Sequence, residues 1–357
     1  MFLAVLVVIT LIPAVAGIVI FGDIPWLRKT GVFKVKRWLL SWFSQIDKIY
    51  HQLDDSCGGK LLYYINWLIP LFYILVVSFC FQQFFIQTYP ILQEIGQIGL
   101  WSRIYIYFSM AMVYLATWLA VFTDPGQPST GVPYKFVNNQ LIFFNNRICH
   151  TCNIIKPARS KHCSICNKCY LLFDHHCIWI NNCVGLYNYR WFLLYLAVNI
   201  NFLIYGGYLC LSALNFKTKQ LDLSYWSCIK YNESTKVTGC FTILCFTFSF
   251  ITSVFTFLHL RYIYLGVTTS EADKWLEIEY LINLGLLYKL DTPINHEIYV
   301  EKASINDDIV YISLNSGKVL IDTKFDHPNL LKISSIEHID NIYDEGFWKN
   351  LKHRLLL

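Results

Sequence analysis

Long apolar stretches are the feature that most limits how this chain of 357 residues can fold. A helix needs about 20 consecutive apolar residues to cross the hydrocarbon core of a bilayer. Stretches of that kind predict membrane-spanning helices at residues 1–22, 61–81, 100–122, 191–214 and 241–265. Only 15% of the residues are charged, against about 25% in a typical soluble domain. We therefore expect a polytopic α-helical membrane protein with about five spans.

The first of these stretches, residues 1–22, lacks a basic start and a clear small-residue cleavage site. A signal peptide that is removed after targeting normally has both features. We therefore interpret the stretch as a membrane anchor that stays in the protein, with a signal peptide as the alternative.

Lysine and arginine residues are distributed unevenly between the loops. Residues 28–60 and 123–190 contain seven each, whereas residues 82–99 contain none. Cytosolic loops carry an excess of these residues, so both basic segments are expected in the cytosol, with the N-terminus in the lumen and the tail in the cytosol. The loop at 215–238 would then be lumenal. Its four lysines argue against that placement, and its glycosylation sequon at Asn232 argues for it.

Seven cysteines and four histidines lie within the 35 residues from Cys149 to Cys183. A Cys-x2-Cys pair lets two thiolates bind one tetrahedral ion from a tight turn, and such pairs begin at Cys149 and Cys163. The spacing predicts two zinc sites, which we expect to be structural because four filled positions leave none for a catalytic water. Two such sites use eight of the eleven candidate ligands, and the spacing alone does not say which are left over. Clustered cysteines of this kind are typical of a reducing, cytosolic environment.

The cluster contains the run Asp174-His175-His176-Cys177. A cysteine that is not bound to zinc and lies beside a histidine is a candidate nucleophile. A free thiol is mostly protonated at cytosolic pH, and a neighbouring imidazole that accepts its proton increases the thiolate fraction. A carboxylate can hold that imidazole in the required tautomer. These residue types in this order indicate nucleophilic chemistry on a thiol.

The segment CHTCNIIKPARSKHCSICNKCYLLFDHHCIWINNCVGLYN resembles the cysteine-rich domain of the DHHC protein S-acyltransferases, also called palmitoyltransferases. Three further elements agree with this family in the right order, namely TDPG at 123–126, TTSE at 268–271 and NIYDEGF at 341–347 with the following Asn350. Within the family, the motifs are most similar to those of the fungal spore-wall-formation palmitoyltransferases.

The resemblance implies a role for each group in the DHHC run. Cys177 would be the nucleophile that accepts the acyl group as a thioester, His175 its general base and Asp174 the group that orients His175. The first structural zinc ion would bind Cys149, Cys152, His162 and Cys169, and the second would bind Cys163, Cys166, His176 and Cys183. His150 matches no family role, and we expect it to be a solvated surface histidine.

The acyl donor that the resemblance implies is palmitoyl-CoA, a long-chain acyl-CoA. Lys156 and Arg159 match a basic motif of the family and are expected to contact the CoA phosphates, and Trp179 is expected at the cofactor site. The family usually has proline after the catalytic cysteine, where this chain has Ile178, and the change alters backbone freedom beside the nucleophile. Thr269 either hydrogen-bonds near the catalytic carboxylate or only caps a helix.

The resemblance also implies partners and a location. The expected acceptors are membrane proteins with juxtamembrane cysteines, SNAREs among them, and we expect the protein in the endoplasmic reticulum membrane with its catalytic domain in the cytosol. Nucleic acid is not expected, because the zinc knuckles lie between spans and the basic residues are scattered. A transporter would need ionisable residues at mid-membrane, and apart from His259 near the end of the last span none is found. The alternative function is a catalytically silent zinc-binding scaffold, which would not need an unligated cysteine beside a spare histidine.

The expected architecture is a polytopic α-helical membrane protein with a cytosolic two-zinc cysteine-rich domain between spans 3 and 4 and a small cytosolic α+β tail. In the tail, Ser270 to Asp273 resembles a capping box that opens a helix, and residues 309–314 and 318–322 flank a turn and predict a hairpin. The expected segments are the N-terminal anchor, a cytosolic basic loop, spans 2 and 3, the DHHC catalytic domain, spans 4 and 5 with their lumenal loop, and the tail, at residues 1–27, 28–60, 61–123, 124–190, 191–265 and 266–357.

Overall fold

The chain divides into two compact units in the computed structural model, residues 1–114 with 199–251 and residues 115–198 with 252–357. We describe each unit by itself. The structure describes Val15, Ile18 and residues 30–56, 61–128, 136–290, 297–305, 307–322 and 330–355. Apart from Val15 and Ile18, the predicted first span therefore lies outside the described residues.

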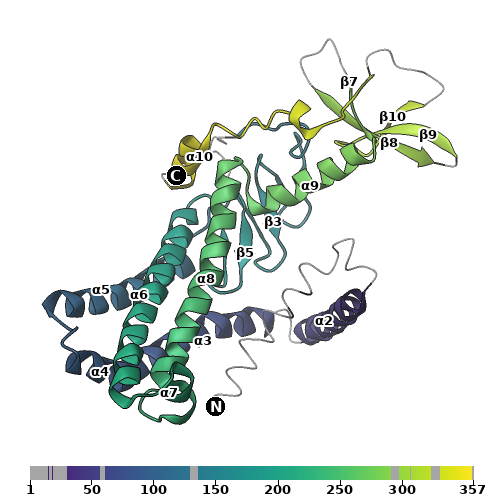
Figure 1. The fold of residues 1–357 in the computed structure, drawn as a ribbon. Coiled ribbons are helices and arrows are strands. Elements are labelled where there is room, and N and C mark those ends of the chain that lie inside the picture. Colours follow the sequence, from purple (N-terminus) through teal and green to yellow (C-terminus); the bar gives the residue numbers. More distant parts are fainter. Residues whose placement is uncertain are drawn as a thin grey trace. The chain divides into compact units, whose positions relative to one another are not determined.

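Four helices in the described part of the chain are long and apolar enough to cross a membrane (Figure 1). The first runs over Tyr64–Glu94, and the others are α5 (Leu100–Phe122), α6 (Tyr189–Leu221) and α8 (Lys236–Tyr264). They coincide with four of the predicted spans. The chain is therefore a multi-pass membrane protein.

The first of these helices is longer than the sequence predicts. α3 (Leu61–Gln83) continues through a π-helical turn, η1 (Phe84–Thr88), into α4 (Tyr89–Glu94). Glutamine has nearly the helix propensity of leucine, so the two glutamines before η1 do not end the helix. The helical stretch ends just before Gly96, whose φ of 76° is a conformation that glycine adopts without strain.

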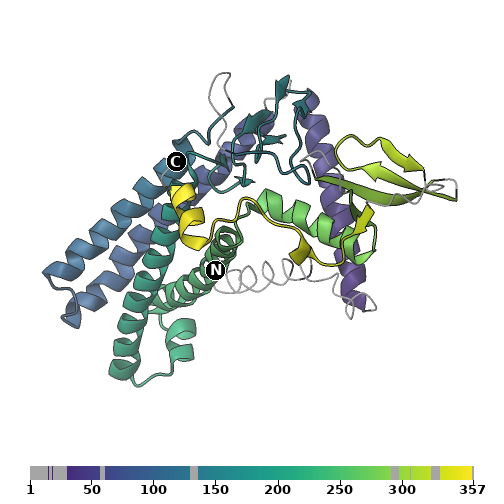
Figure 2. The ribbon, with the colours of Figure 1, turned by 90° about the horizontal axis from the view of Figure 1, so that it is seen from above.

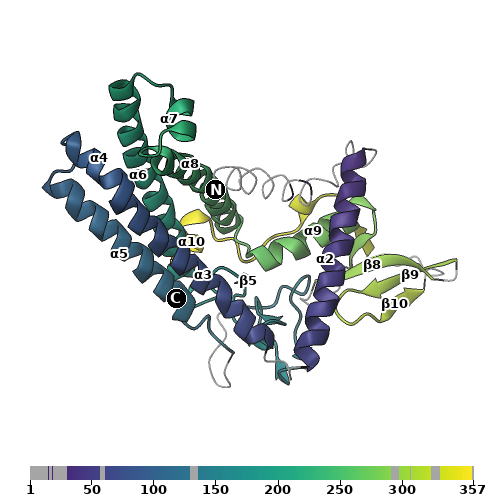
Figure 3. The same ribbon diagram turned by 90° about the horizontal axis from the view of Figure 1, so that it is seen from below.

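The segment expected to be a basic loop contains a helix of 26 residues, α2 (Gly31–Ser56), drawn in purple in Figure 3. Apolar side chains recur along it at helical spacing, at Val35, Trp38 and Trp42. A helix was not predicted in this inter-span segment, although its apolar period is present in the sequence. The predicted loop at 215–238 likewise contains a short helix, α7 (Tyr225–Tyr231), between α6 and α8.

The cysteine-rich part of the chain folds into three small antiparallel ribbons, each made of two strands. The strand pairs are β1 (Ile148–Cys149) with β2 (Ile154–Ile155), β3 (Lys161–Cys163) with β4 (Lys168–Tyr170), and β5 (His175–Cys177) with β6 (Asn182–Val184). The three connecting turns contain Asn153, Asn167 and Asn181, all with positive φ. Asparagine tolerates this left-handed conformation better than most residues, so each turn is encoded locally.

The tail begins with the helix α9 (Thr269–Asn283). Its capping box is formed by Thr268 and Glu271, and not by the predicted Ser270 and Asp273. Both pairs have the required spacing, but the longer Glu271 side chain reaches back to accept a hydrogen bond from the Thr268 N–H at 2.9 Å.

A five-stranded antiparallel sheet follows α9, with the strand order β10-β9-β8-β7-β11 (Figure 2). The predicted hairpin is confirmed, because β9 pairs with β10 around a turn in which Gly317 has a φ of 65°. The chain ends, in its described part, with the turn η2 and the helix α10. The bounds are β7 (Leu287–Leu290), β8 (Ile298–Ile305), β9 (Asp308–Ser313), β10 (Val319–Asp322), β11 (Leu330–Lys332), η2 (Ile336–His338) and α10 (Phe347–Leu355).

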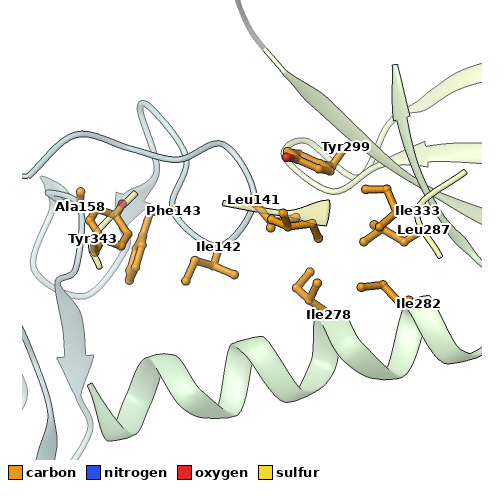
Figure 4. Packing of buried hydrophobic residues seen from close by; sticks show 11 residues of the cluster. Leu141, Ile142, Phe143, Ala158, Ile278, Ile282, Leu287, Tyr299, Ile333 and Tyr343 are labelled. Atoms are coloured by element: carbon orange, nitrogen blue, oxygen red, sulfur yellow. The ribbon is translucent and has the colours of Figure 1, made fainter. Parts of the chain in front are cut away.

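An apolar core joins the tail to the residues that precede the cysteine-rich part (Figure 4). Ile278 and Ile282 of α9 lie below side chains from the sheet, such as Leu287 and Tyr299. The same core continues to the loop residues Leu141, Ile142 and Phe143. The sequence does not predict this continuation, because the two parts are more than a hundred residues apart.

Candidate zinc centres and active site

The first cluster of metal-binding side chains brings together Cys149, Cys152, His162 and Cys169. His162 Nδ1 lies 3.2 Å from Cys152 Sγ, 3.5 Å from Cys149 Sγ and 3.8 Å from Cys169 Sγ. Ligands of a tetrahedral zinc ion are separated by about 3.3–3.8 Å, given Zn–N and Zn–S bonds of about 2.0–2.3 Å. The donor set and its spacing therefore suit a zinc ion.

The second cluster brings together Cys163, Cys166, His176 and Cys183. His176 Nδ1 lies 3.4 Å from Cys166 Sγ and 3.6 Å from Cys183 Sγ, and these two sulfurs are 3.5 Å apart. The structure thus groups the same residues that the family resemblance implies for each ion. Two Cys3His clusters suit two zinc ions, and neither leaves a ligand position open for chemistry.

The ribbons explain how neighbouring residues serve different ions. In β3, His162 and Cys163 point to opposite faces of the strand because side chains alternate along it. His162 pairs with Cys169 on β4 and joins the first cluster, whereas Cys163 joins the second. In the same way, His176 pairs with Cys183 on β6.

The same alternation separates the catalytic candidates from the zinc ligands. His175 and Cys177 are two residues apart on β5 and share one face, while His176 points to the zinc cluster on the other. Cys177 is buried and belongs to neither Cys3His cluster. The short strand β5 therefore places the Cys177 thiol on the same face as His175, while His176 between them belongs to the second cluster.

Asp174 is held at its position by contacts from two directions. Its carboxylate lies 2.8 Å from His175 Nδ1 and accepts hydrogen bonds from the Thr269 N–H at 3.0 Å and the Thr269 Oγ1 at 2.7 Å. Only 1% of Asp174 is exposed. Burial alone would raise the pKa of Asp174, but the hydrogen bond from His175 and the nearby positive charges, including Arg354, hold it below its usual range. Of the two roles expected for Thr269, the contact with the carboxylate is the one that the structure shows.

His175 is the partner that connects Asp174 to the thiol. Burial lowers the pKa of His175, but the hydrogen bond with Asp174 and the proximity of Cys177 outweigh it and raise the pKa to about 9. With Nδ1 bonded to Asp174, the other ring nitrogen, Nε2, is buried and has no hydrogen-bond partner among the described residues. Nε2 is therefore the atom left to exchange a proton.

His259 on α8 is a member of this site that the sequence did not assign. Its Nδ1 lies 3.8 Å from an Asp174 oxygen and 3.3 Å from the hydroxyl of Tyr189. Asp174, His175 and His259 are close enough to be considered for a metal ion. The 2.8 Å separation of Asp174 and His175 is that of a hydrogen bond, which accounts for the arrangement without one. The sequence feature that could have indicated a role for His259 is that it is a lone ionisable residue in an apolar span.

Asn182 connects the β5–β6 ribbon to the end of α5 and was also missed. Its side-chain amide donates to the backbone oxygens of Ala120, Val121 and Thr123 at 2.9–3.3 Å. The first two carbonyls belong to the last turn of α5, where they have no partner within the helix, and Thr123 directly follows it. Asn182 thereby satisfies the helix end and fixes the ribbon that carries Cys177.

The three residues expected at the cofactor site have different surroundings. Arg159 is only 6% exposed, and its guanidinium donates to Glu271 at 2.6 and 2.7 Å and to the Gly266 carbonyl at 2.8 Å. Arg159 thus forms a buried ion pair, and its contact with a CoA phosphate stays a prediction. Lys156 is partly exposed, and Trp179 is 54% exposed beside Cys177 in sequence.

His150 lies outside both clusters. Its side chain is exposed, and it is absent from the groups of metal-binding residues found in the described part of the chain. This position agrees with a solvated surface histidine.

Comparison with known proteins places these features in a family. Residues 142–276 match the DHHC palmitoyltransferase family. Palmitoyltransferase SWF1 of Candida albicans is 49% identical over 99% of both chains, and that of Debaryomyces hansenii is 48% identical over 99% of this chain and 97% of the relative. Palmitoyltransferase SWF1 of Yarrowia lipolytica is 30% identical over 93% of this chain and 92% of the relative. The chain therefore belongs to the DHHC palmitoyltransferase family and is a protein S-acyltransferase that uses acyl-CoA.

Proposed function

We propose that Cys177 carries the acyl group during transfer from a long-chain acyl-CoA to cysteines of membrane proteins. The observation that supports this most is the position of Cys177. Of the seven cysteines from Cys149 to Cys183, all of them described, it is the one outside both Cys3His clusters. It also shares a strand face with His175, whose Nε2 has no other described partner.

In the first step, His175 Nε2 accepts the proton of the Cys177 thiol, and Asp174 stabilises the imidazolium through Nδ1. The thiolate attacks the thioester carbonyl of acyl-CoA, so that a new S–C bond forms and the bond to the CoA sulfur breaks. The leaving CoA thiolate takes the proton back from His175. The products are an acyl-Cys177 thioester, free CoA and His175 in its starting state.

In the second step, the thiol of a substrate cysteine gives its proton to His175 and attacks the acyl-Cys177 thioester. The Cys177 thiolate leaves and regains a proton from His175. No oxidant or reductant is needed, because one thioester is exchanged for another. The two zinc ions, held by the Cys3His clusters, fix the ribbon geometry and take no part in these steps.

Acyl-CoA is proposed to lie beside the ribbon that carries the nucleophile. Ile178 and Trp179 follow Cys177 and are both exposed, so they offer apolar surface to an incoming acyl chain. Lys156 remains the proposed phosphate contact, since Arg159 is paired with Glu271. Phosphate recognition would then depend on a flexible point charge and not on a bidentate guanidinium.

The proposed acceptors are membrane proteins with juxtamembrane cysteines, with SNAREs as the first class to test. α6, a candidate span, begins at Tyr189, only six residues after Cys183, which keeps the catalytic ribbon close to the membrane in sequence. The proposed location is the endoplasmic reticulum membrane, with the catalytic domain, residues 124–190, in the cytosol. The basic residues flanking the spans support that orientation.

Labelling of the purified full-length protein with an alkynyl palmitoyl-CoA tests the assignment. Wild type should take up label that hydroxylamine removes, and Cys177→Ser should take up none. Cys240→Ser is the matched control, because Cys240 lies outside both zinc clusters and should not affect labelling. Label on Cys177→Ser would contradict the proposal. An unlabelled wild type that still binds two zinc ions would favour the scaffold function.

A further inference from the structure

α2 carries apolar and charged side chains on different faces. At 100° per residue, Val35, Trp38, Trp42 and Ile49 fall within about 60° of the helix circumference. All four are exposed, Trp38 by 59% and Trp42 by 56%. An exposed stripe with two tryptophans needs a partner, because large apolar side chains that form one continuous stripe are rarely left in water.

The charged residues in the first part of α2 are basic, and its three acidic residues, Asp47, Asp54 and Asp55, lie in the second part. Lys34, Arg37 and Lys48 are exposed; Arg37 and Lys48 lie about 110–130° around the helix from the centre of the stripe, and Lys34 lies at its margin. Residues 31–46 contain three basic side chains and no acidic one. Positive charge near a helix N-terminus opposes the helix dipole, so these residues do not stabilise α2 by themselves. Their placement fits an external anionic surface.

The composition of the stripe favours lipid over another protein as its partner. A coiled coil would repeat branched aliphatic residues every three or four positions. Here Gln45 and Gln52 occupy the positions that would continue that seam, and the centre of the stripe is Trp38 and Trp42. Tryptophan is enriched at the membrane–water interface, where its ring is partly buried and its N–H remains hydrated.

The chain itself keeps α2 near a membrane. α2 ends at Ser56, and α3, which enters the first described candidate span, begins at Leu61. Two described candidate spans then separate α2 from the cysteine-rich part, so both lie on the same side of the membrane. By the distribution of basic residues, the segment that contains α2 is expected to face the anionic cytosolic leaflet.

We propose that α2 is an amphipathic helix that lies in the plane of the membrane interface. The stripe of Val35, Trp38, Trp42 and Ile49 enters the acyl-chain boundary, and Lys34, Arg37 and Lys48 remain among anionic headgroups. Such a helix binds through its buried apolar area and through attraction to anionic lipid. This inference does not depend on the assignment of Cys177.

Lipid quenching in the full-length protein tests the orientation of α2. An environment-sensitive fluorescent amino acid is introduced at Trp42, on the stripe, or at Ser44, on the charged face, and each protein is reconstituted with brominated phospholipid. Emission from position 42 should be blue-shifted and quenched several-fold more than emission from position 44. Equal quenching at both positions would overturn the proposal. A blue shift at position 42 without quenching would mean that protein covers the stripe, and would also overturn it.

The role of the charges is tested with a variant that keeps the stripe. Lys34→Gln combined with Arg37→Gln should reduce quenching at position 42 in vesicles that contain phosphatidylserine, and have little effect in neutral vesicles. Each basic residue near an anionic surface changes partitioning by about fivefold, and added salt should weaken that effect. Identical quenching of parent and variant in both vesicle types would contradict the electrostatic part. Gln45→Glu adds one negative charge beside the stripe, so quenching at position 42 should fall in this variant as well.

Discussion

The cysteine-rich segment (residues 148–184) and the tail (residues 266–355) are stabilised in different ways. The cysteine-rich segment has strands of two or three residues, and its buried cluster consists of Tyr170, Phe173 and cysteines. The tail has a five-stranded sheet and a helix that bury a continuous apolar core. One region depends on metal ligands for its shape and the other on burial of apolar surface.

The difference explains where the catalytic residues lie. Isolated two-stranded ribbons are marginal in water, so zinc bound by His176 and Cys183 would add to the support that Asn182 gives the β5–β6 ribbon. A metal site fixes neighbouring side chains more rigidly than a small apolar core does. The tail contacts the site mainly through hydrogen bonds from Thr269 and Ser270 to Asp174 and through the two-point ion pair of Glu271 with Arg159.

Loss of zinc should have the largest effect and should be confined to one region. Cys163→Ala removes a ligand, and the binding energy of a structural zinc ion, on the order of 10 kcal/mol, is largely folding energy. We expect less than two zinc ions per chain, loss of acyl labelling and new protease cleavage between residues 148 and 184. Cys210→Ala, a buried cysteine outside both clusters, is the control. Equal cleavage of the tail would show that the two regions fold as one.

Breaking the ion pair between the regions should have the next largest effect. Glu271→Gln leaves the Arg159 guanidinium buried and uncompensated, which costs about 3–5 kcal/mol. The melting temperature should fall, while zinc content stays at the parent level. Glu277→Gln, on the same helix but exposed, removes the same charge and should change little. A melting temperature equal to that of the parent would mean that Arg159 finds water or another anion.

A truncation in the tail core should destabilise the tail and spare the zinc clusters. Leu287 is fully buried, and Leu287→Ala should lower the free energy of unfolding by about 2–5 kcal/mol. Hydrogen exchange should then increase in β7 and β8 but not in β3 to β6. Leu331→Ala, at an exposed position of the same sheet, is the matched control. Increased exchange in β5 would indicate that the apolar core also supports the catalytic ribbon.

The smallest expected effect lies at the contact between the two regions. Thr269→Val removes the hydroxyl that donates to Asp174 but keeps the backbone N–H donor, a loss of about 1.5–3 kcal/mol for a hydrogen bond to a charged group. The rate of Cys177 acylation should fall with zinc content unchanged, and Thr269→Ser should restore it. Unchanged acylation in Thr269→Val would mean that the N–H alone orients Asp174.

Local patterns in the sequence account for the features that were predicted well. Four spans follow from the length of apolar runs, and the presence of two zinc sites follows from two Cys-x2-Cys spacings that tight turns can close. The β9–β10 hairpin follows from a turn sequence between two apolar runs. The apolar spacing that forms α2 is an equally local pattern, and it lies in a segment that also carries many charges.

The sequence by itself determined four membrane spans and a segment dense in zinc-binding residues, whereas the ligand set of each ion and Cys177 as the free cysteine were implied by the resemblance to the DHHC family. Only the tertiary structure decided that Arg159 pairs with Glu271, that His259 joins Asp174, and that residues 141–143 share the tail core. The physical reason is distance along the chain. Ligand spacing and the length of an apolar run are properties of residues that are close in sequence. The partner of a buried charge can be far away in sequence, so a local pattern does not predict it.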